Sequence, residues 1–152
     1  MGTLYVVGTP IGNMEDVTFR QLETLKSVDF IAAEDTRVTL KLLNRYGIKK
    51  TLVSYHRHSG ENCALSIMER IKNGENAAIV TDAGMPCISD PGEDLVKICA
   101  ENEVDVKVVP GPSAVISALA VSGLSTSRFS FEGLIKNRDT SILKIYKTIR
   151  EL

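Results

Sequence analysis

Long hydrophobic segments and paired cysteines are both missing from this 152-residue sequence. The longest apolar stretch, Ala114–Val121, contains a serine and is well short of the roughly 20 residues that a membrane-spanning helix needs. The cysteines Cys63, Cys87 and Cys99 match neither a disulfide framework nor the Cys-x-x-Cys pattern of a zinc site. No basic region followed by an apolar run opens the sequence. We therefore expect no membrane span, no secretion and a reducing, cytoplasmic environment.

An excess of charge of either sign is also absent. The 18 basic residues are balanced by 19 acidic residues, so no overall field attracts nucleic acid, and any such contact must come from a local patch. Apolar residues make up 43% of the chain and charged residues 24%, which is typical of a folded globular protein.

Two common nucleotide-binding signatures are missing. No Gly-Lys-Ser/Thr occurs, which excludes a Walker loop, and the stretch from Gly8 to Gly12 lacks the G-x-G-x-x-G spacing of a dinucleotide site. Pro10 also removes a backbone donor that a pyrophosphate would need. His56 and His58 are expected to share a strand face, but no third ligand is evident, so we predict no metal site.

Strand-like and helix-like patterns alternate over the first 110 residues or so. This alternation predicts an α/β fold with a mostly parallel five-stranded sheet and helices on both faces. The expected strands are residues 4–7, 28–33, 51–55, 77–81 and 104–109, and the expected helices are residues 18–25, 36–46, 62–73 and 93–102.

The last part of the sequence predicts a second unit. Residues 113–122 are apolar on nearly all sides, which is typical of a buried helix, and we expect them to complete a first domain over residues 1–122. Residues 123–128 are rich in Ser, Gly and Thr and are interpreted as a linker. A strand at residues 129–132 and a helix at 139–152 would then begin a second, incomplete α/β domain spanning 129–152.

Three loops of small residues each follow a predicted strand: residues 8–13, 82–86 and 110–114. Open α/β sheets bind ligands at the carboxyl ends of their strands, where loops without bulky side chains let a ligand approach the backbone. The three loops therefore predict one composite pocket. The second loop continues to residue 92 with further Pro and Gly, which favours binding over a simple connection.

Six segments of the sequence closely resemble the ribosomal RNA small-subunit methyltransferase I family, which belongs to the tetrapyrrole methylase superfamily of S-adenosylmethionine-dependent enzymes. They occur in the family's order and spacing, from about residue 3 to residue 133. The combination of Gly-Thr-Pro-Ile-Gly-Asn with Glu-Asp-Thr-Arg distinguishes the sequence from the cobalamin-pathway relatives. The segments are residues 4–13, 33–37, 54–56, 81–86, 88–92 and 109–114.

The resemblance implies 2′-O-methylation of a cytidine in small-subunit (16S) ribosomal RNA by a homodimer with two α/β domains per chain. It also implies that S-adenosylmethionine lies folded in the cleft between the domains. Carried onto this sequence, the cofactor would contact Pro10, Asp82, Ala83, Gly84, Met85, Pro86, Ile88, Pro112, Ser113 and Ala114.

A ribose hydroxyl is a poor nucleophile, so a nearby proton acceptor would assist its attack on the methyl group. Three candidates just past predicted strands are Glu34, Asp35 and His56. For the two acids an equally good interpretation is a helix start, where a carboxylate caps the helix and stabilises its dipole.

Basic residues four apart follow the acidic pair. Arg37, Lys41 and Arg45 would form a stripe along one side of a helix and are candidates for contacts with RNA phosphates. The alternative is an ordinary solvated helix face.

The sequence departs from the family after Gly133. The family continues with an aromatic residue, a proline and a basic cluster, whereas Leu134-Ile135-Lys136 follows here. We therefore expect the 152 residues to be inactive alone, and apolar surface near residues 113–122 and 129 to favour dimerisation. Two alternative functions remain open: a tetrapyrrole (corrin precursor) C-methyltransferase, and a non-catalytic module that binds cofactor or RNA.

Overall fold

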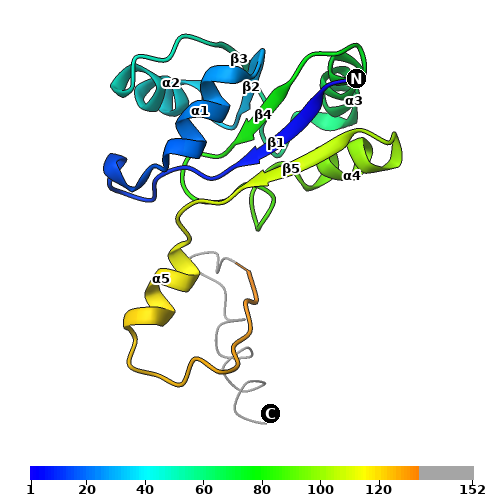
Figure 1. Ribbon diagram of the computed structural model, residues 1–152. Coiled ribbons are helices and arrows are strands. Elements are labelled where there is room, and N and C mark those ends of the chain that lie inside the picture. Colours follow the sequence, from blue (N-terminus) through cyan, green and yellow to red (C-terminus); the bar gives the residue numbers. More distant parts are fainter. Residues whose placement is uncertain (134–152) are drawn as a thin grey trace.

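A single parallel β-sheet organises the protein, for which the computed structural model describes residues 1–133 (Figure 1). All four strand pairs are parallel, in the order β3-β2-β4-β1-β5. The prediction of a five-stranded, mostly parallel sheet is confirmed. The strands are β1 (Thr3–Val7), β2 (Phe30–Ala33), β3 (Thr51–Ser54), β4 (Ala77–Val80) and β5 (Asp105–Val109).

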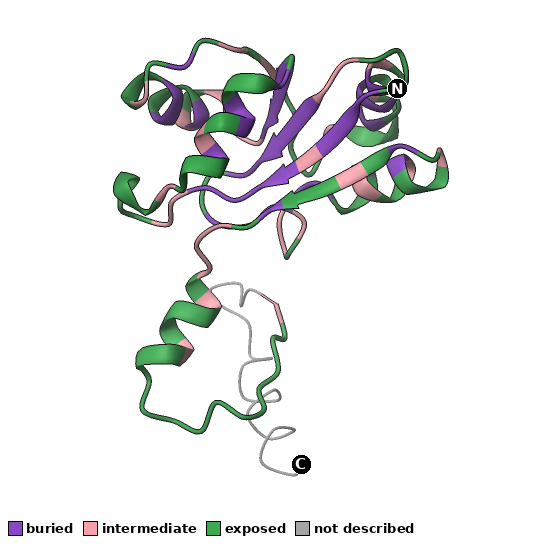
Figure 2. Cartoon of the chain, in the orientation of Figure 1, coloured by how far each residue is buried: buried purple, intermediate pink, exposed green. Residues whose placement is uncertain are grey.

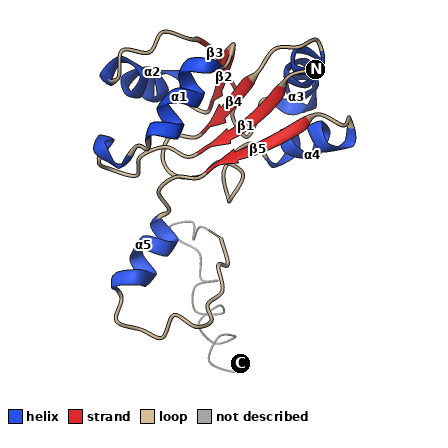
Figure 3. Ribbon diagram, viewed as in Figure 1, coloured by secondary structure: helices blue, strands red, loops and turns tan. Residues whose placement is uncertain are grey.

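Helices cover both faces of this sheet, as expected. Figure 3 shows α1 and α2 on one side and α3 and α4 on the other, while α5 projects away from the sheet. Within residues 1–133, no helix is long and apolar enough to cross a bilayer. The helices are the 3-10 helix η1 (Met14–Asp16), α1 (Phe19–Ser27), α2 (Thr36–Arg45), α3 (Gly60–Lys72), α4 (Glu93–Glu101) and α5 (Ala114–Val121).

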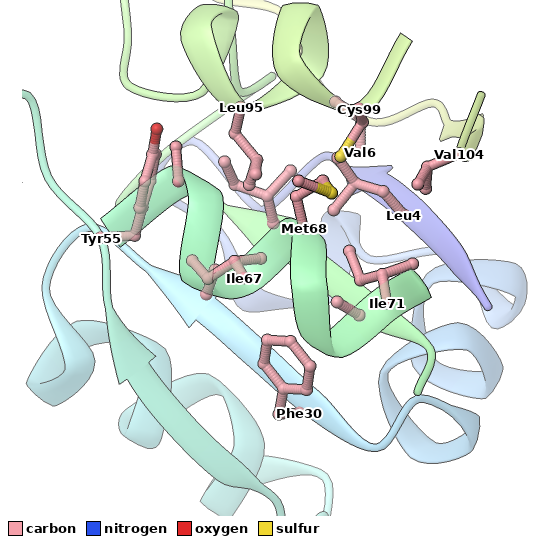
Figure 4. Close-up of a cluster of buried hydrophobic side chains, with 14 residues drawn as sticks. Leu4, Val6, Phe30, Tyr55, Ile67, Met68, Ile71, Leu95, Cys99 and Val104 are labelled. Atoms are coloured by element: carbon pink, nitrogen blue, oxygen red, sulfur yellow. The ribbon is translucent and has the colours of Figure 1, made fainter. Parts of the chain in front are cut away.

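The core consists of two layers, one on each face of the sheet. Successive side chains of a strand point to opposite faces, so Leu4 and Val6 of β1 join the layer under α3 and α4 (Figure 4), whereas Val7 joins the layer under α1 and α2. Every residue of β2 and β4 is buried, because both strands lie inside the sheet and are covered twice.

The prediction that helix 113–122 is buried is wrong. No residue of α5 is buried, and Ile116 and Val121 are 54% and 86% exposed (Figure 2). An all-round apolar sequence shows that a helix needs cover but does not show what covers it. Within residues 1–133, nothing packs over this helix closely enough to bury it.

The strand predicted at residues 129–132 is not formed. Phe129 and Phe131 lie in coil and are exposed, because a strand needs a neighbour for its backbone hydrogen bonds and none lies beside them in the described chain. The predicted linker 123–128 also has no helix or strand. The helix predicted at 139–152 lies outside the described residues, and the division into two domains stays a prediction.

Helical spacing predicts that Phe19, Leu22 and Leu25 face the core from α1. Leu25 is buried and Leu22 is partly buried, but Phe19 is 90% exposed and Gln21 is completely buried. On α3 the same spacing predicts Leu65, Met68 and Ile71, of which only Leu65 is exposed. In α1 the polar side chain occupies the buried position because its hydrogen bonds are satisfied there.

Gln21 connects the loops that follow β1 and β5. Its Nε2 donates to the carbonyl oxygens of Gly8 at 2.9 Å and Pro110 at 3.2 Å. Its Oε1 accepts from the backbone N–H of Thr18, which completes a capping box at the start of α1. One buried amide therefore fixes the helix start and both loops.

We expect Gln21→Leu to lower the free energy of unfolding by about 1–3 kcal/mol, because the buried Gly8 carbonyl oxygen, the partly buried Pro110 carbonyl oxygen and the Thr18 N–H lose their partner. Urea denaturation followed by circular dichroism measures the change. Glu23→Gln is the control on the exposed side of α1, and we expect it to alter the free energy by less than about 0.5 kcal/mol. An unchanged midpoint for Gln21→Leu would show that the amide is not a structural link.

Asp35 is the N-cap of α2, as predicted for the acidic pair. Its Oδ1 accepts from the backbone N–H of Arg37 at 2.8 Å, and its carboxylate also contacts the Arg37 guanidinium at 3.0 and 2.6 Å. The hydrogen bonds from Arg37, side chain first and backbone second, lower the pKa of Asp35 from 3.8 to about 2. Asp35 therefore caps α2, and its carboxylate accepts three hydrogen bonds from Arg37.

The lowered pKa makes Asp35 a source of pH-dependent stability. Because the folded-state pKa lies below the unfolded value, the contribution is complete above pH 3.8 and is lost as the pH falls toward about 2. Carboxyl-carbon NMR should show a midpoint near pH 2, which Arg37→Gln moves toward 3.8. A wild-type midpoint at 3.8 would contradict the contact.

Candidate functional site

The three loops of small residues meet at one edge of the sheet. Thr9 and Gly84 exchange two backbone hydrogen bonds of 2.9 and 3.1 Å, which join the loop after β1 to the loop after β4. The backbone of Gly8 lies against that of Gly111 in the loop after β5. The convergence that the sequence predicts is therefore present in the structure.

Glycine is required where these loops touch. A Cβ atom on Gly8 would lie 2.7 Å from the Gly111 Cα, and one on Gly111 would lie 2.3 Å from the Gln21 Nε2. Both contacts are shorter than van der Waals packing permits, so any side chain would separate the loops. The result is a close junction of the three loops at the carboxyl ends of β1, β4 and β5, in which Gly8 and Gly84 are buried while the nearby Asp82 and Ala83 are exposed.

The loop from residue 82 to residue 92 has a strained backbone. Cys87 and Ser89 have positive φ angles of 71° and 58°, a conformation that residues other than glycine rarely adopt. The loop buries more than its sequence predicts, since Pro86, Pro91 and Gly92 are all buried. Strain of this kind is often found at functional sites.

Two residues from the end of β3 hold this loop in place. Arg57 donates through Nη2 to the carbonyl oxygen of Ser89 at 2.7 Å. The Tyr55 hydroxyl donates to Oδ1 of Asp94, in the first turn of α4, at 2.5 Å. Tyr55 is 2% exposed, and burial together with the Asp94 carboxylate raises the pKa of its hydroxyl, so it stays a donor.

Acidic residues follow both β2 and β4: Glu34 and Asp35 come after β2, and Asp82 and Asp90 come after β4. The Glu34 carboxylate accepts from the backbone N–H of Asp82 at 3.4 Å, and the Asp82 carboxylate accepts from that of Asp35 at 3.1 Å. Burial raises the pKa of Glu34, and the nearby charges of Asp82 and Asp90 raise it further, while the Asp82 N–H and Arg57 oppose the shift. Burial likewise raises the pKa of Asp90.

The three proton-acceptor candidates have different environments. Glu34 is half-buried at the sheet edge, and Asp35 is occupied by capping and by Arg37. His56 lies in the exposed loop after β3, where its Nδ1 accepts from the backbone N–H of His58 at 3.2 Å. The prediction that both histidines share a strand face is wrong, because β3 ends at Ser54.

The candidate cofactor residues after β5 lead directly into α5. Ser113 is the N-cap of this helix, and its Oγ accepts from the backbone N–H of Ile116 at 3.4 Å. Pro112 lies against Gly84, whose added Cβ would be 3.7 Å from the Pro112 carbonyl oxygen. Ala114 is exposed. In residues 1–133, no three His, Cys, Asp or Glu side chains are grouped closely enough to hold a metal ion.

A pocket of about 300 Å³ opens between the loop after β1, helix α2 and the end of β4. The hydroxyl oxygen of Thr81, one of its lining residues, is buried and has no hydrogen-bond partner within residues 1–133. The lining residues are Thr9, Pro10, Ile11, Gly12, Met14, Val38, Thr39, Leu42, Thr81, Asp82 and Ala83.

The basic stripe lies on the exposed side of α2. Arg37, Lys41 and Arg45 are all exposed, and Arg37 is held by Asp35. The exposed position of this stripe agrees with the prediction from the sequence.

Two residues that hold the loops in place were not predicted from the sequence. For Gln21 the available signal is the capping-box pattern Thr18-x-x-Gln21, whereas for Arg57 no local pattern exists.

Comparison with known proteins supports the fold and the family. Residues 3–145 match the family of Tetrapyrrole (Corrin/Porphyrin) Methylases. The uroporphyrin-III-C-methyltransferase from Thermus thermophilus superposes with a TM-score of 0.61 at 21% identity, covering 84% of this chain and 55% of that one. At this identity the likeness shows the fold alone.

Two curated relatives are far more similar in sequence. Both are named "Ribosomal RNA small subunit methyltransferase I": the protein of Thermotoga maritima is 50% identical over 99% of this chain, and that of Synechocystis is 48% identical over 91%. The chain spans 69% of the first relative and 50% of the second. The chain therefore belongs to the ribosomal RNA small subunit methyltransferase I family, within the tetrapyrrole methylases.

Proposed function

We propose that the complete protein transfers a methyl group from S-adenosylmethionine to the ribose 2′-hydroxyl of a cytidine in small-subunit ribosomal RNA. The observation that carries this proposal is the convergence of three small-residue loops beside a half-buried carboxylate, Glu34. Family membership supports methyl transfer to ribosomal RNA, and the geometry of the site supports cofactor binding by the loops and proton acceptance by Glu34.

The residues at the sheet edge fit the proposed cofactor. The contact of Gly8 with Gly111 and the two hydrogen bonds between Thr9 and Gly84 hold the small-residue loops together, and the carboxylates of Asp82 and Asp90 favour a positively charged group nearby. S-adenosylmethionine supplies an electrophilic methyl carbon on a cationic sulfonium sulfur. We propose that it is held by Pro10, Asp82, Ala83, Gly84, Met85, Pro86, Ile88, Pro112, Ser113 and Ala114.

Glu34 is the residue that we propose as proton acceptor. Asp35 is occupied by the helix cap and by Arg37, and the His56 ring accepts a local backbone N–H. The Glu34 carboxylate has one long hydrogen bond of 3.4 Å and retains acceptor capacity. As the ribose oxygen gains the methyl group, the bond from that methyl carbon to the sulfonium sulfur would break and S-adenosylhomocysteine would leave, while Glu34 would accept the hydroxyl proton. Positioning would supply much of the remaining acceleration.

We further propose where the enzyme acts and how its subunits assemble. Ribosomal RNA as substrate implies a cytoplasmic enzyme. The exposed apolar surface of α5 and Phe129 is consistent with a homodimer in which this surface is covered. We also propose that residues 1–152 alone do not transfer methyl groups, because the cofactor cleft of the family lies between two domains.

The test compares Glu34→Gln with wild type in the complete protein. The amide keeps the shape and still accepts from the Asp82 N–H, so we expect kcat for methyl transfer to fall by about 10²–10⁴-fold. Affinity for S-adenosylhomocysteine should stay within twofold. Methyl transfer to 30S subunits is measured with a radiolabelled donor, and Glu61→Gln, at an exposed position of α3, is the matched control.

Three outcomes would count against the proposal. Unchanged kcat in Glu34→Gln would remove the assigned base. Wild-type methylation of uroporphyrinogen-type macrocycles in place of 30S subunits would identify a tetrapyrrole C-methyltransferase. Cofactor or RNA binding without any turnover would identify a binding module.

A further inference from the structure

The pocket beside α2 is separate from most of the loop surface proposed for the cofactor. Val38 and Leu42 line it from α2, on the face of the sheet that α1 and α2 cover. Met85 and Cys87 instead pack against the core layer on the opposite face, under α3 and α4. The two regions meet at Pro10, Asp82 and Ala83, so two ligands bound there would be neighbours.

Most of the pocket is lined by apolar side chains, and its size is suited to a small ring. Ile11, Met14, Val38 and Leu42 provide apolar walls, and a volume of about 300 Å³ is at the lower end of the range for small-molecule sites. The Thr81 side chain adds a polar group, and Thr81 is only 3% exposed. Its buried hydroxyl lacks a partner among the described residues. A buried hydroxyl without a partner carries a free-energy cost, which a hydrogen bond to a ligand in the adjoining pocket would offset once the Thr81 side chain turns toward that ligand.

Two exposed basic residues lie on the same helix, next in sequence to the pocket walls. Arg37 and Lys41 immediately precede the wall residues Val38 and Leu42, and both are exposed on α2. The chain carries a net charge of only −1, so this row is a local feature and not part of a general basic surface. The phosphates that flank a base in the pocket would therefore have two cations on α2 to contact, of which Arg37 is also paired with Asp35.

The proposed proton acceptor, Glu34, does not line the pocket but is hydrogen-bonded to a residue that does. Asp82 lines the pocket, and its backbone N–H donates to the Glu34 carboxylate at 3.4 Å. A sugar attached to a ring in the pocket could thus reach Glu34 and the cofactor surface together. A base can enter such a pocket only when it is unstacked from its neighbours.

We propose that this pocket receives the unstacked pyrimidine base of the target nucleotide, with Thr81 hydrogen-bonded to the base and the α2 cations on the flanking phosphates. This inference rests on the proposed function and assigns a separate place to the RNA substrate. It divides the site into a base pocket on the α2 side and a cofactor surface formed by the loops after β4 and β5.

The experiment uses the complete protein and two variants that change only the pocket. Val38→Phe fills it from a half-buried position on α2, and Thr81→Val removes the hydroxyl while keeping the side-chain shape. For both we expect the KM for 30S subunits to rise at least fivefold while the Kd for S-adenosylhomocysteine stays within twofold. Leu65→Phe, at an exposed position of α3 on the other face of the sheet, is the control and should change neither value.

A binding measurement makes the pocket testable independently of turnover. Cytidine 5′-monophosphate should shift the NMR signals of Val38, Leu42 and Thr81 in the wild-type protein, and Val38→Phe should abolish these shifts. The pocket assignment fails if the nucleotide shifts none of them, if the variants leave KM unchanged, or if they weaken S-adenosylhomocysteine as much as RNA. Absence of wild-type methyl transfer to RNA, with the nucleotide shifts intact, would overturn the proposed function and leave the pocket as a pyrimidine-nucleotide site.

Discussion

The contact between the backbones of Gly8 and Gly111 is the constraint on which the rest of the site depends. It brings the end of β1 against the end of β5 so closely that neither residue can carry a side chain. Gln21 fixes the pair by donating to carbonyl oxygens of both loops, and Thr9 extends the contact to Gly84 after β4. Three chain segments far apart in sequence are thereby joined into one surface.

Charge is distributed unevenly around this surface. Glu34, Asp82 and Asp90 make the ends of β2 and β4 acidic, while α2 presents its basic stripe of Arg37, Lys41 and Arg45 to solvent. A cationic methyl donor and an anionic RNA have opposite electrostatic requirements. In the proposed function, one short helix with its preceding loop separates the two environments, so both ligands are accommodated by a chain that is almost neutral overall.

The alternation of strands and helices, and the meeting of the small-residue loops, could be predicted from the sequence because both follow from local pattern and the geometry of parallel sheets. The burial of a side chain that depends on a distant contact could not be predicted from the sequence. The apolar sequence of α5 predicts a buried helix, yet within residues 1–133 it is exposed. Gln21 was missed because a glutamine is usually at the surface, and only its hydrogen bonds explain its burial. Arg57 was missed because its contact with Ser89 joins two irregular loops.

A crystal structure of the complete protein with S-adenosylhomocysteine tests the central claim most directly, namely that the joined loops form the cofactor surface. We predict that the ligand contacts the backbone around Gly84 and Pro112 and leaves the pocket lined by Val38 and Leu42 free for the base. A ligand that fills that pocket, or that binds away from the loop contact, would contradict the assignment.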